Sequence, residues 1–278
     1  MRFALDALGR WTQERSFVVE RERVRAYAAA TNETRPEHVG GDLAPPVFAI
    51  LPVWDVLHEA SESIAPEEAR RFIVHGEQDM FLHVPLVPGM ELTARAAPVG
   101  VHPKPSGTTL VVKTETRDAG GTLVDEQYVT EFFRGVVAEE GGGEAAPDHR
   151  VPEEVTGGEP AAAITYAFDD DQTYRYADAS GDRFPIHLDE EFARAAGLPG
   201  IIVHGLCTMA FTSRAVLEAA GCGAGALRRL AVRFSRPVPP GESLTTRIWN
   251  VAPGTYAFEA VDGAGQVVIK DGLAEVSS

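Results

Sequence analysis

The chain of 278 residues contains little cysteine, and its cysteines and histidines do not form a regular metal-binding pattern. Its two cysteines, Cys207 and Cys222, do not have the spacing of metal ligands, and none of the eight histidines lies in an HxxxH pattern. We therefore predict no bound metal and no cofactor. So few cysteines also favour a reducing compartment, so we expect a cytoplasmic protein.

Basic side chains are also scarce. Lysine and arginine together number 25 against 41 aspartates and glutamates, which gives a formal net charge of −16. Nucleic acids and anionic membrane surfaces would be repelled by this charge, so we expect neither as a partner. Runs of about 20 apolar residues, the length needed to cross a bilayer, are missing, and residues 1–15 lack the apolar core of a signal peptide.

What remains is the composition of an ordinary globular protein, with 44% hydrophobic and 24% charged residues. The length is sufficient for two domains. Residues 135–160 are rich in glycine, proline and glutamate and contain seven acidic residues and one basic residue. This composition is typical of a solvated linker. We therefore expect an N-terminal domain at 1–134, a linker at 135–160 and a C-terminal domain at 161–278.

The two expected domains repeat each other. YAAATNETRPEH at Tyr27–His38 aligns with YADASGDRFPIH at Tyr176–His187, at an offset of 149 residues. The alignment pairs Tyr27 with Tyr176, Glu33 with Asp182 and His38 with His187. A second pair of similar segments, HVPLVPGMEL and SRPVPPGESL, lies further on in each half. We therefore expect a pseudo-dimer with one site at each seam, or a single site where one copy has decayed.

Each half continues with an apolar helix-like run, at 46–58 and at 201–220. Strand-like segments divided by proline or glycine turns follow each run, at 72–82, 90–97, 108–117, 123–133, 230–234, 243–251, 256–261 and 267–276. A helix followed by a series of hairpins predicts an antiparallel sheet packed on one helix. The predicted fold class is α+β, with two such units in one chain.

Chemistry concentrates in the second copy of the repeat. Ser180-Gly181 breaks the preceding helical pattern, and Pro185 disfavours helix at Phe184, so Asp182 and His187 should lie on a rigid loop. An acid and a histidine held together are sufficient for general acid–base catalysis. Asp182 could instead only cap backbone amides, and His187 could be a core histidine.

A second feature is the start of the apolar run at His204-Gly205. The first backbone NH groups of a helix point out of it with the positive end of the dipole behind them, which suits a developing oxyanion. Glycine allows close approach to the backbone, although simple packing against a sheet would also require it. The first half has Phe48-Ala49 near the equivalent place, which does not suit a polar carbonyl.

The second half resembles the MaoC-like, type 2 (R-specific) enoyl-CoA hydratases of the hot-dog fold. The residues that match the family pattern are Tyr176, Ser180, Gly181, Asp182, Pro185, Ile186, His187, Asp189, His204 and Gly205. The first half resembles the FAS1-like dehydratase N-terminal domain through APPVFAIL and His75–Gly89. The resemblance implies a double hot-dog fold, with two antiparallel sheets each wrapped on a central helix.

Hydration of 2-enoyl thioesters, or its reverse, is the reaction that the resemblance implies, in acyl-CoA and fatty acid metabolism. Asp182 and His187 would hold one water between them. The resemblance favours His187 as the residue that exchanges a proton with the water and Asp182 as the residue that exchanges a proton with C2. The Gly205 NH would stabilise the enolate oxygen. His204, Ser180, Tyr176 and Phe184 would complete the substrate-binding site. Phe184 departs from the pattern, because the family usually has asparagine there and a phenyl ring cannot replace the hydrogen bonds of an amide.

We predict one binding site for the acyl chain of the substrate and another for the phosphates of CoA. Phe48, Ile50 and Trp54 would line an acyl pocket, although the same helix could be a buried core helix. A cluster of arginines could bind the phosphates of CoA or could be an ordinary solvated face: Arg228, Arg229, Arg233 and Arg236. We expect CoA rather than a carrier protein as the thiol, and a homodimer of double hot-dog chains. The alternatives are a non-catalytic acyl-thioester-binding protein and a hot-dog thioesterase.

Overall fold

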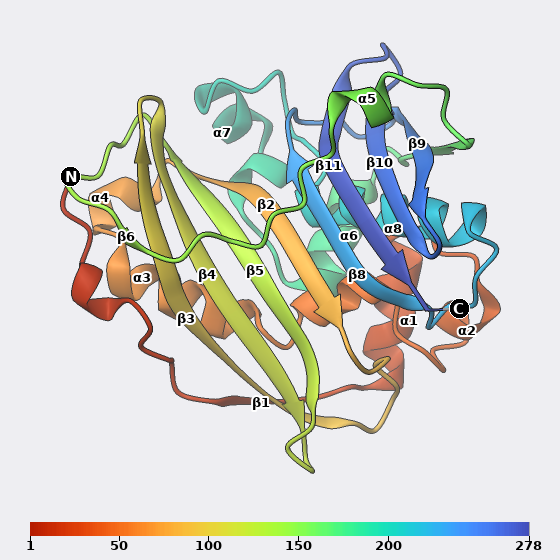
Figure 1. The fold of residues 1–278 in the computed structure, drawn as a ribbon, viewed down its shortest axis with the longest axis horizontal. Helices are drawn as coiled ribbons and strands as arrows, with labels where there is room; N and C mark the ends of the chain where they lie inside the picture. Colours follow the sequence, from red (N-terminus) through yellow and green to blue (C-terminus); the bar gives the residue numbers. More distant parts are fainter. Residues whose placement is uncertain (278) are drawn as a thin grey trace. The chain divides into compact units, whose positions relative to one another are not determined.

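The computed structural model describes residues 1–277, which divide into two compact units (Figure 1). Unit 1 is formed by Met1–Val18, Pro52–Val84 and Met90–Asp148. Unit 2 is formed by Val19–Leu51, Pro85–Gly89 and the chain from His149 onward. The boundary at 148–149 lies within the predicted linker, while residues 19–51 of the first half group with unit 2.

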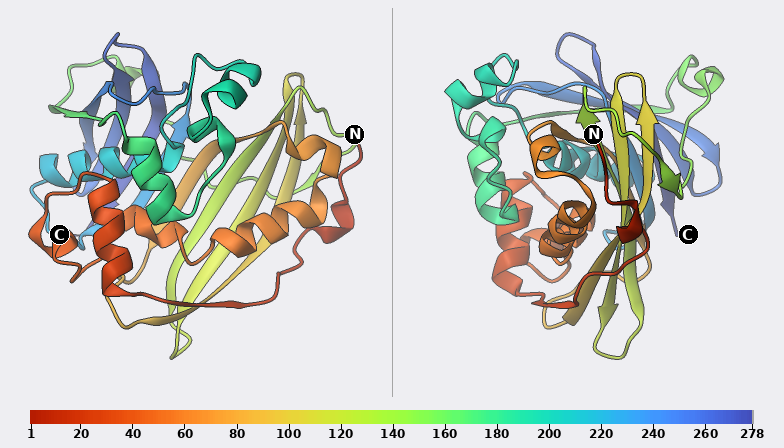
Figure 2. Two further views of the ribbon diagram at one scale, coloured as in Figure 1. Left: turned by 180° about the vertical axis from the view of Figure 1, so that it is seen from behind. Right: turned by 90° about the vertical axis from the view of Figure 1, so that its left-hand side faces the viewer.

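Unit 1 is an antiparallel sheet with a helix across one face (Figure 2). The strand order is β1-β3-β4-β5-β2, with β6 paired to β3. The bounds are β1 Arg15–Val18, β2 Ile73–Leu82, β3 Glu91–Lys104, β4 Gly107–Asp118, β5 Leu123–Arg134 and β6 Gly142–Gly143. Helix α3 (Trp54–Ile64) buries Val56, Leu57, Ala60 and Ile64 and packs on β3 and β4. The short helices η1 (Leu5–Ala7) and α4 (Glu67–Arg70) complete the unit.

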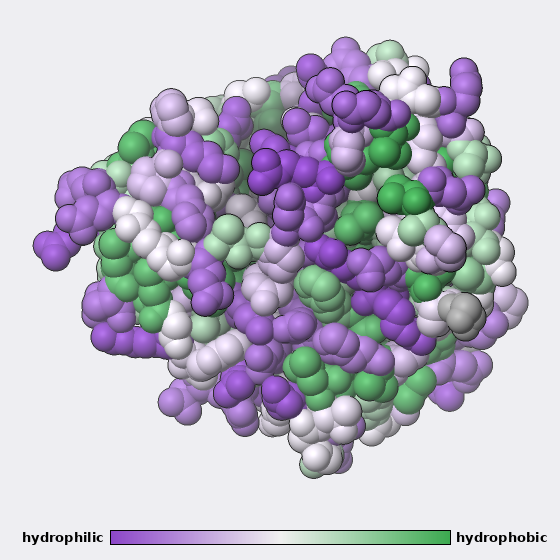
Figure 3. All heavy atoms as spheres, in the orientation of Figure 1, coloured by the Kyte–Doolittle hydropathy of each residue, from purple (hydrophilic) through white to green (hydrophobic). Residues whose placement is uncertain are grey.

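The other face of this sheet carries charged side chains, because residues alternate between the two faces of a strand. Arg95 is 2.8 Å from Glu115, and Lys113 is 2.9 Å from Glu126. Figure 3 shows hydrophilic and hydrophobic side chains interspersed over the face that it presents. This alternation of charged outer and buried inner residues is the pattern of a sheet that is covered on one face only.

Unit 2 repeats the arrangement with a longer helix. Its antiparallel strand order is β8-β11-β10-β9-β7. The bounds are β7 Ala162–Ala167, β8 Leu227–Phe234, β9 Ser243–Ala252, β10 Thr255–Asp262 and β11 Val267–Val276. Helix α8 (Gly205–Ala219) is buried on nearly all sides, as its apolar sequence predicts. The remaining helices are α1 (Arg21–Ala30), α2 (Pro36–Val39), η2 (Pro46–Ile50), α5 (Glu153–Thr156), α6 (Gln172–Ser180), η3 (Pro185–His187) and α7 (Glu190–Ala195).

The predicted α+β class and double hot-dog architecture are confirmed, since each unit has an antiparallel sheet and its own helix. One contact in the structure joins equivalent residues of the internal repeat. Tyr27 on α1 and Tyr176 on α6 are equivalent in the repeat, and their hydroxyls are 3.2 Å apart in unit 2. A contact between equivalent residues of two copies is the contact found on a twofold axis.

Some predicted elements differ in extent. The helix-like run 46–58 is interrupted: η2 ends at Ile50, and α3 begins only at Trp54, after Pro52. Proline removes a helical amide donor and clashes with the preceding turn, which explains the break. The second run starts as helix at Gly205, with 201–204 outside it. Strands β1 and β7 were not predicted from the sequence, because each is short.

The acidic segment 135–160 makes ordered contacts with both units. In unit 1, β6 pairs with Gly100 and Val101, and Glu144 N donates to the Val99 carbonyl at 2.7 Å. In unit 2, the Trp249 indole NH donates to the Gly158 carbonyl at 2.9 Å. Backbone hydrogen bonds therefore hold a segment whose composition alone suggested a solvated linker.

Candidate active site

The loop that carries the acid and the histidine has the predicted geometry. Helix α6 ends at Ser180, and Gly181 follows with φ of 84°, a left-handed conformation that favours glycine. Pro185 begins the short helix η3, which ends at His187. Asp189 then accepts hydrogen bonds from Glu191 N and Phe192 N and caps α7. Asp182 is thus placed between two local stop signals and is held against η3.

His187 is buried, with 7% of its surface exposed, and one of its ring nitrogens makes a hydrogen bond to the backbone. Nδ1 lies 2.8 Å from the Ile202 carbonyl oxygen. Because a carbonyl can only accept, Nδ1 carries the proton and Nε2 presents a lone pair. Burial lowers the pKa of His187, opposed by the nearby Asp182 carboxylate and by the bond to Ile202. A neutral imidazole with a bare Nε2 is a general base.

Asp182 lies beside this base and is only partly buried. Its Oδ1 accepts a hydrogen bond from Phe184 N at 3.1 Å. Asp182, His187 and His204 each offer one polar atom, and the three atoms lie within 4.8 Å of one another. One water that makes tetrahedral hydrogen bonds of about 2.8 Å separates its partners by about 4.6 Å. The site therefore has the dimensions to bind a single water between acid and base.

His204 packs face to face on His187. The ring centroids are 3.8 Å apart and the ring planes differ by 20°. Nε2 of His204 lies 3.0 Å from the backbone carbonyl oxygen of Asp182, so it donates to that oxygen. Burial, followed by the neighbouring His187, lowers the pKa of His204 to about 3. His204 is thus neutral in the ordinary pH range.

The same stacking bears on metal binding. Asp182, His187 and His204 form a three-residue group of possible ligands. An imidazole binds a metal along the lone pair in its ring plane. The two nearly parallel planes are separated by about the ring spacing, so both lone pairs cannot converge on one ion without a ring rotation. The geometry fits a water site better than a metal centre.

Gly205 is the first residue of α8 and is partly exposed, whereas His204 and Leu206 beside it are buried. The first amides of a helix have no intrahelical acceptor. A Cβ at Gly205 would lie 3.1 Å from the Phe234 ring, so close packing also requires glycine here. Both predicted reasons for this glycine are therefore compatible with the structure.

The other predicted substrate-binding residues have structural contacts of their own. Tyr176 is 1% exposed, and its ring lies 4.8 Å from that of His204. Ser180 Oγ accepts from Asp182 N at 3.2 Å and so supports the turn. Phe184 is 43% exposed and contacts Phe192 edge to face at 6.2 Å. The backbone amide of Phe184, and not its side chain, holds the Asp182 carboxylate.

In the first-half copy of the repeat, the equivalents of the acid and the histidine are bonded to the backbone near them. His38 is fully buried, with Nδ1 bound to the Leu43 carbonyl at 2.9 Å. Glu33 Oε1 accepts from Thr34 N at 2.7 Å and Arg35 N at 3.0 Å, and the Arg214 guanidinium lies 4.0 Å away. Phe48 packs on Tyr27 at 5.5 Å, as His204 packs on Tyr176. These contacts favour a structural role for Glu33 and His38.

The predicted acyl-pocket residues lie in different surroundings. Phe48 and Ile50 are buried in unit 2 at 0% and 1% exposure. Trp54 belongs to unit 1, is partly exposed and contacts the His58 ring edge to face at 4.7 Å. Phe48 connects to the acid–base loop through ring contacts, by way of Tyr27 and Tyr176.

The predicted phosphate-binding arginines are only partly available. Arg228 donates to the Gly225 carbonyl at 2.8 Å, and Arg229 lies 3.4 Å from Glu275. Arg233 and Arg236 are exposed, and Arg233 pairs across the strands with Lys270. Arg236 is therefore the better candidate for an anion contact.

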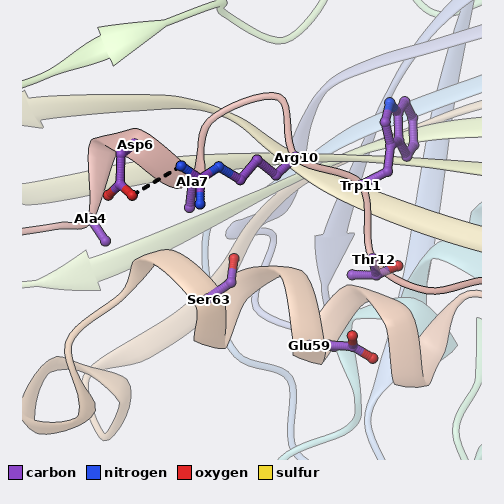
Figure 4. A pocket seen from close by; sticks show the side chains of 8 residues that line it. All are labelled: Ala4, Asp6, Ala7, Arg10, Trp11, Thr12, Glu59 and Ser63. Atoms are coloured by element: carbon purple, nitrogen blue, oxygen red, sulfur yellow. Dashed lines mark hydrogen bonds and ion pairs between the residues drawn. The ribbon is translucent and has the colours of Figure 1, made fainter.

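A separate hollow of about 250 Å³ lies in unit 1 between the N-terminal segment and α3 (Figure 4). It is lined by Ala4, Asp6, Ala7, Arg10, Trp11, Thr12, Glu59 and Ser63. Arg10 is paired with Asp6 at 3.2 Å. None of the predicted site residues lines it.

Among residues 1–277, no helix has the length and apolar character needed to cross a bilayer.

Two contacts in the site were not predicted from the sequence. The Ile202 carbonyl that selects the His187 tautomer precedes the HG pair by only two residues, but a backbone acceptor has no sequence signal. The hydroxyl contact between Tyr27 and Tyr176 could have been inferred, because the two residues are equivalent in the 149-residue repeat.

Comparison with known proteins identifies the family of the chain. Residues 144–271 match the family model of the MaoC like domain, and residues 6–127 match the FAS1-like, dehydratase domain region. The chain is 35% identical over 213 residues to 3-hydroxyacyl-thioester dehydratase Y of Mycobacterium tuberculosis, which covers 73% of this chain and 72% of the relative. The chain belongs to the MaoC-like dehydratase family.

Two further matches support this assignment. The chain is 29% identical over 237 residues to the probable enoyl-CoA hydratase 2 of Dictyostelium discoideum, covering 83% of this chain and 79% of that protein. The crystal structure of a MaoC-like dehydratase from Phytophthora Capsici superimposes with a TM-score of 0.84 at 26% identity, covering 99% and 97% of the two chains. These relatives have names of hydratases and dehydratases, the class of reaction that an acid–base pair and one water can perform.

Proposed function

We propose that this protein is a hydro-lyase that adds water reversibly to 2-enoyl thioesters to give (R)-3-hydroxyacyl thioesters. The observation that carries the proposal is the neutral His187 with a bare Nε2, within 4.8 Å of a polar atom of Asp182, at the start of α8. The dehydratase and hydratase names of the relatives support the same reaction class.

In the hydration direction, the water oxygen forms a bond to C3 while His187 Nε2 accepts one water proton. The C2–C3 π electrons move toward the thioester, and the carbonyl oxygen gains negative charge. The backbone NH of Gly205 is the candidate donor to that oxygen; loss of one such donor costs about 10²–10³ in rate in other enzymes. The Asp182 carboxylate receives the proton that His187 took from the water and passes it to C2, so that H and OH are added across the double bond and both side chains return to their starting states.

The finer assignments are also proposals. The thiol is coenzyme A rather than a carrier protein, since carrier proteins are acidic and this chain has a net charge of −16. The chain comprises two hot-dog domains at 1–134 and 161–278, the first with a decayed site. It functions as a cytoplasmic homodimer. The acyl chain contacts Phe48 and Ile50 in unit 2.

The test is loss of the conjugated thioester absorbance of a short 2-enoyl-CoA. We expect Asp182→Asn and His187→Ala each to lower kcat by about 10²–10⁴, the usual contribution of a general acid or base. Asp178→Asn, an exposed carboxylate on α6, and His58→Ala, an exposed histidine on α3, are matched controls. Near wild-type turnover in either site variant would remove its assignment. Release of free thiol instead of loss of conjugation would identify a thioesterase.

A further inference from the structure

His204 contacts both members of the acid–base pair, through two different parts of its ring. Its face stacks on His187 at 3.8 Å, and its Nε2–H donates to the backbone carbonyl of Asp182 at 3.0 Å. The side chain is itself held, because it is the N-cap residue of α8 and packs on the Tyr176 ring at 4.8 Å. A rigid, 1% exposed group thus bridges a loop and a helix.

We propose that His204 is a positioning residue for the acid–base pair, which orients His187 by stacking and holds the Asp182 loop by a hydrogen bond. This inference rests on the hydratase function proposed above. Phe184 makes such a residue more important in this chain: its side chain faces out toward Phe192, so residue 184 holds Asp182 only through its backbone amide. The hydrogen bond from His204 is a second restraint on the same residue.

The stacking has an electrostatic consequence for His187. The rings cover one another, so water cannot reach the stacked face of either. The titratable groups that face these two histidines are Asp182 from the loop and Tyr176 from α6, and the His187 Nδ1 proton is held by Ile202. Removing the His204 ring would hydrate His187 and favour its charged form. The base would then be protonated over a wider range of acidic pH.

Two substitutions separate the contacts. His204→Gln keeps an NH donor for the Asp182 carbonyl but removes the stacked ring. His204→Phe keeps a stacked ring but removes the donor. Ser213→Ala is the matched control, because Ser213 is equally buried on α8 and bonds only the Ala210 carbonyl in its own helix.

We expect His204→Gln to move the acid limb of the kcat/KM profile to higher pH, toward the ordinary histidine value near 6.5. We expect His204→Phe to leave that limb in place and to lower kcat by about tenfold to a hundredfold, with KM changed less than about twofold, because a displaced acid lowers turnover more than binding. If His204 only packed the core, both variants would have lower thermal stability, but the pH shift would not be confined to His204→Gln and the fall in kcat would not be confined to His204→Phe.

The closing measurement is an NMR titration of the His187 ring in the free wild-type protein and in each variant. A rise in the His187 pKa in His204→Gln, with no rise in His204→Phe, supports the proposal. Identical titrations and turnover in wild type, both variants and Ser213→Ala would overturn it. If the wild-type protein hydrates no enoyl thioester, the proposed function fails, and the titration still decides whether His204 positions His187.

Discussion

Glu33 and His38 retain the residue types of an acid–base pair, but both side chains are bonded to the backbone near them. His38 is fully buried, and the Glu33 carboxylate is occupied by two backbone amides and by Arg214. A half-buried carboxylate with such partners stabilises the fold. The same residue types thus serve structure in one copy and, in our proposal, chemistry in the other.

We expect Glu33→Gln and His38→Ala to be nearly silent in turnover per folded molecule, while Glu33→Gln lowers the free energy of unfolding by about 1–3 kcal/mol. Turnover and denaturant unfolding should be measured on the same preparations. A fall in kcat as deep as that of His187→Ala would mean that two working sites exist.

The residues differ in how far sequence reasoning could place them. Ser180-Gly181 ends the helix before Asp182, and Pro185 lies between Asp182 and His187, so their loop could be predicted from local signals. The stacking of His204 on His187 could not, because it depends on how α8 packs against η3. Backbone acceptors such as Ile202 have no residue-type signature at all.

At the level of elements, β5 carries two buried carboxyl groups on the covered face of the unit 1 sheet. Asp125 Oδ1 accepts from the Gln127 side chain at 2.8 Å, and Glu131 accepts from Ser61 on α3. Burial raises the pKa of both Asp125 and Glu131 to about 7. Both groups therefore keep their protons in the folded state at pH values where the unfolded chain has released them.

This predicts a stability that falls as pH rises. The pKa of each carboxyl group is higher in the folded protein than the value near 4 in the unfolded chain. Its contribution to the free energy of unfolding is therefore fully present below pH 4 and is lost as pH rises toward 7. The loss is about 1.4 kcal/mol per pH unit for each group. Asp125→Asn and Glu131→Gln should flatten this slope and unfold at higher denaturant concentration at pH 8. Glu91→Gln, exposed on β3, is the control. An unchanged slope in both variants would show that the groups are ionised in the folded protein.

Element η2 provides the test of acyl-chain specificity. Phe48 connects to the site through Tyr27 and Tyr176, with ring centroids 5.5 and 5.6 Å apart. We expect Phe48→Trp to raise KM for long enoyl-CoA substrates by about tenfold and to leave a short substrate nearly unaffected, and Phe48→Ala to tolerate long chains. Equal effects on every chain length would mean that Phe48 only packs the core.

The element pattern was predictable where turn residues bound it. Four strands of each sheet were predicted near their observed positions, and all of these except β2, which follows α4, come after a glycine or proline turn. The apolar run 46–58 read as one helix, but Pro52 separates η2 from α3. The order of strands within each sheet depends on long-range pairing, which a local pattern does not contain.

For the molecule as a whole, the segment after Gly135 is fastened at a residue in an unusual conformation. Asp271 on β11 has φ of 52°, its carbonyl is bound by His149 Nδ1 at 2.7 Å, and its Oδ1 accepts from Val151 N at 3.3 Å. A left-handed conformation costs most residues about 1–2 kcal/mol, but asparagine and aspartate tolerate it.

We expect Asp271→Asn to be nearly neutral, since the amide keeps an acceptor and tolerates the backbone. Asp271→Ala should lower the free energy of unfolding by about 1–2 kcal/mol and speed hydrogen exchange at Val151. Glu154→Ala, exposed on α5, controls for the loss of a charge near the segment. Equal exchange at Val151 in both Asp271 variants would show that the side-chain bond does not hold the segment.

The contact between Tyr27 and Tyr176 has a consequence for how the two copies can change over time. In a homodimer of single units, one gene would encode both tyrosines, and any substitution would alter both sides of the axis at once. Two copies within one chain release that constraint, because each tyrosine has its own codon. A change at position 27 can therefore be selected against an unchanged partner at position 176. One half could lose its chemistry in this way without forcing the same loss on the other.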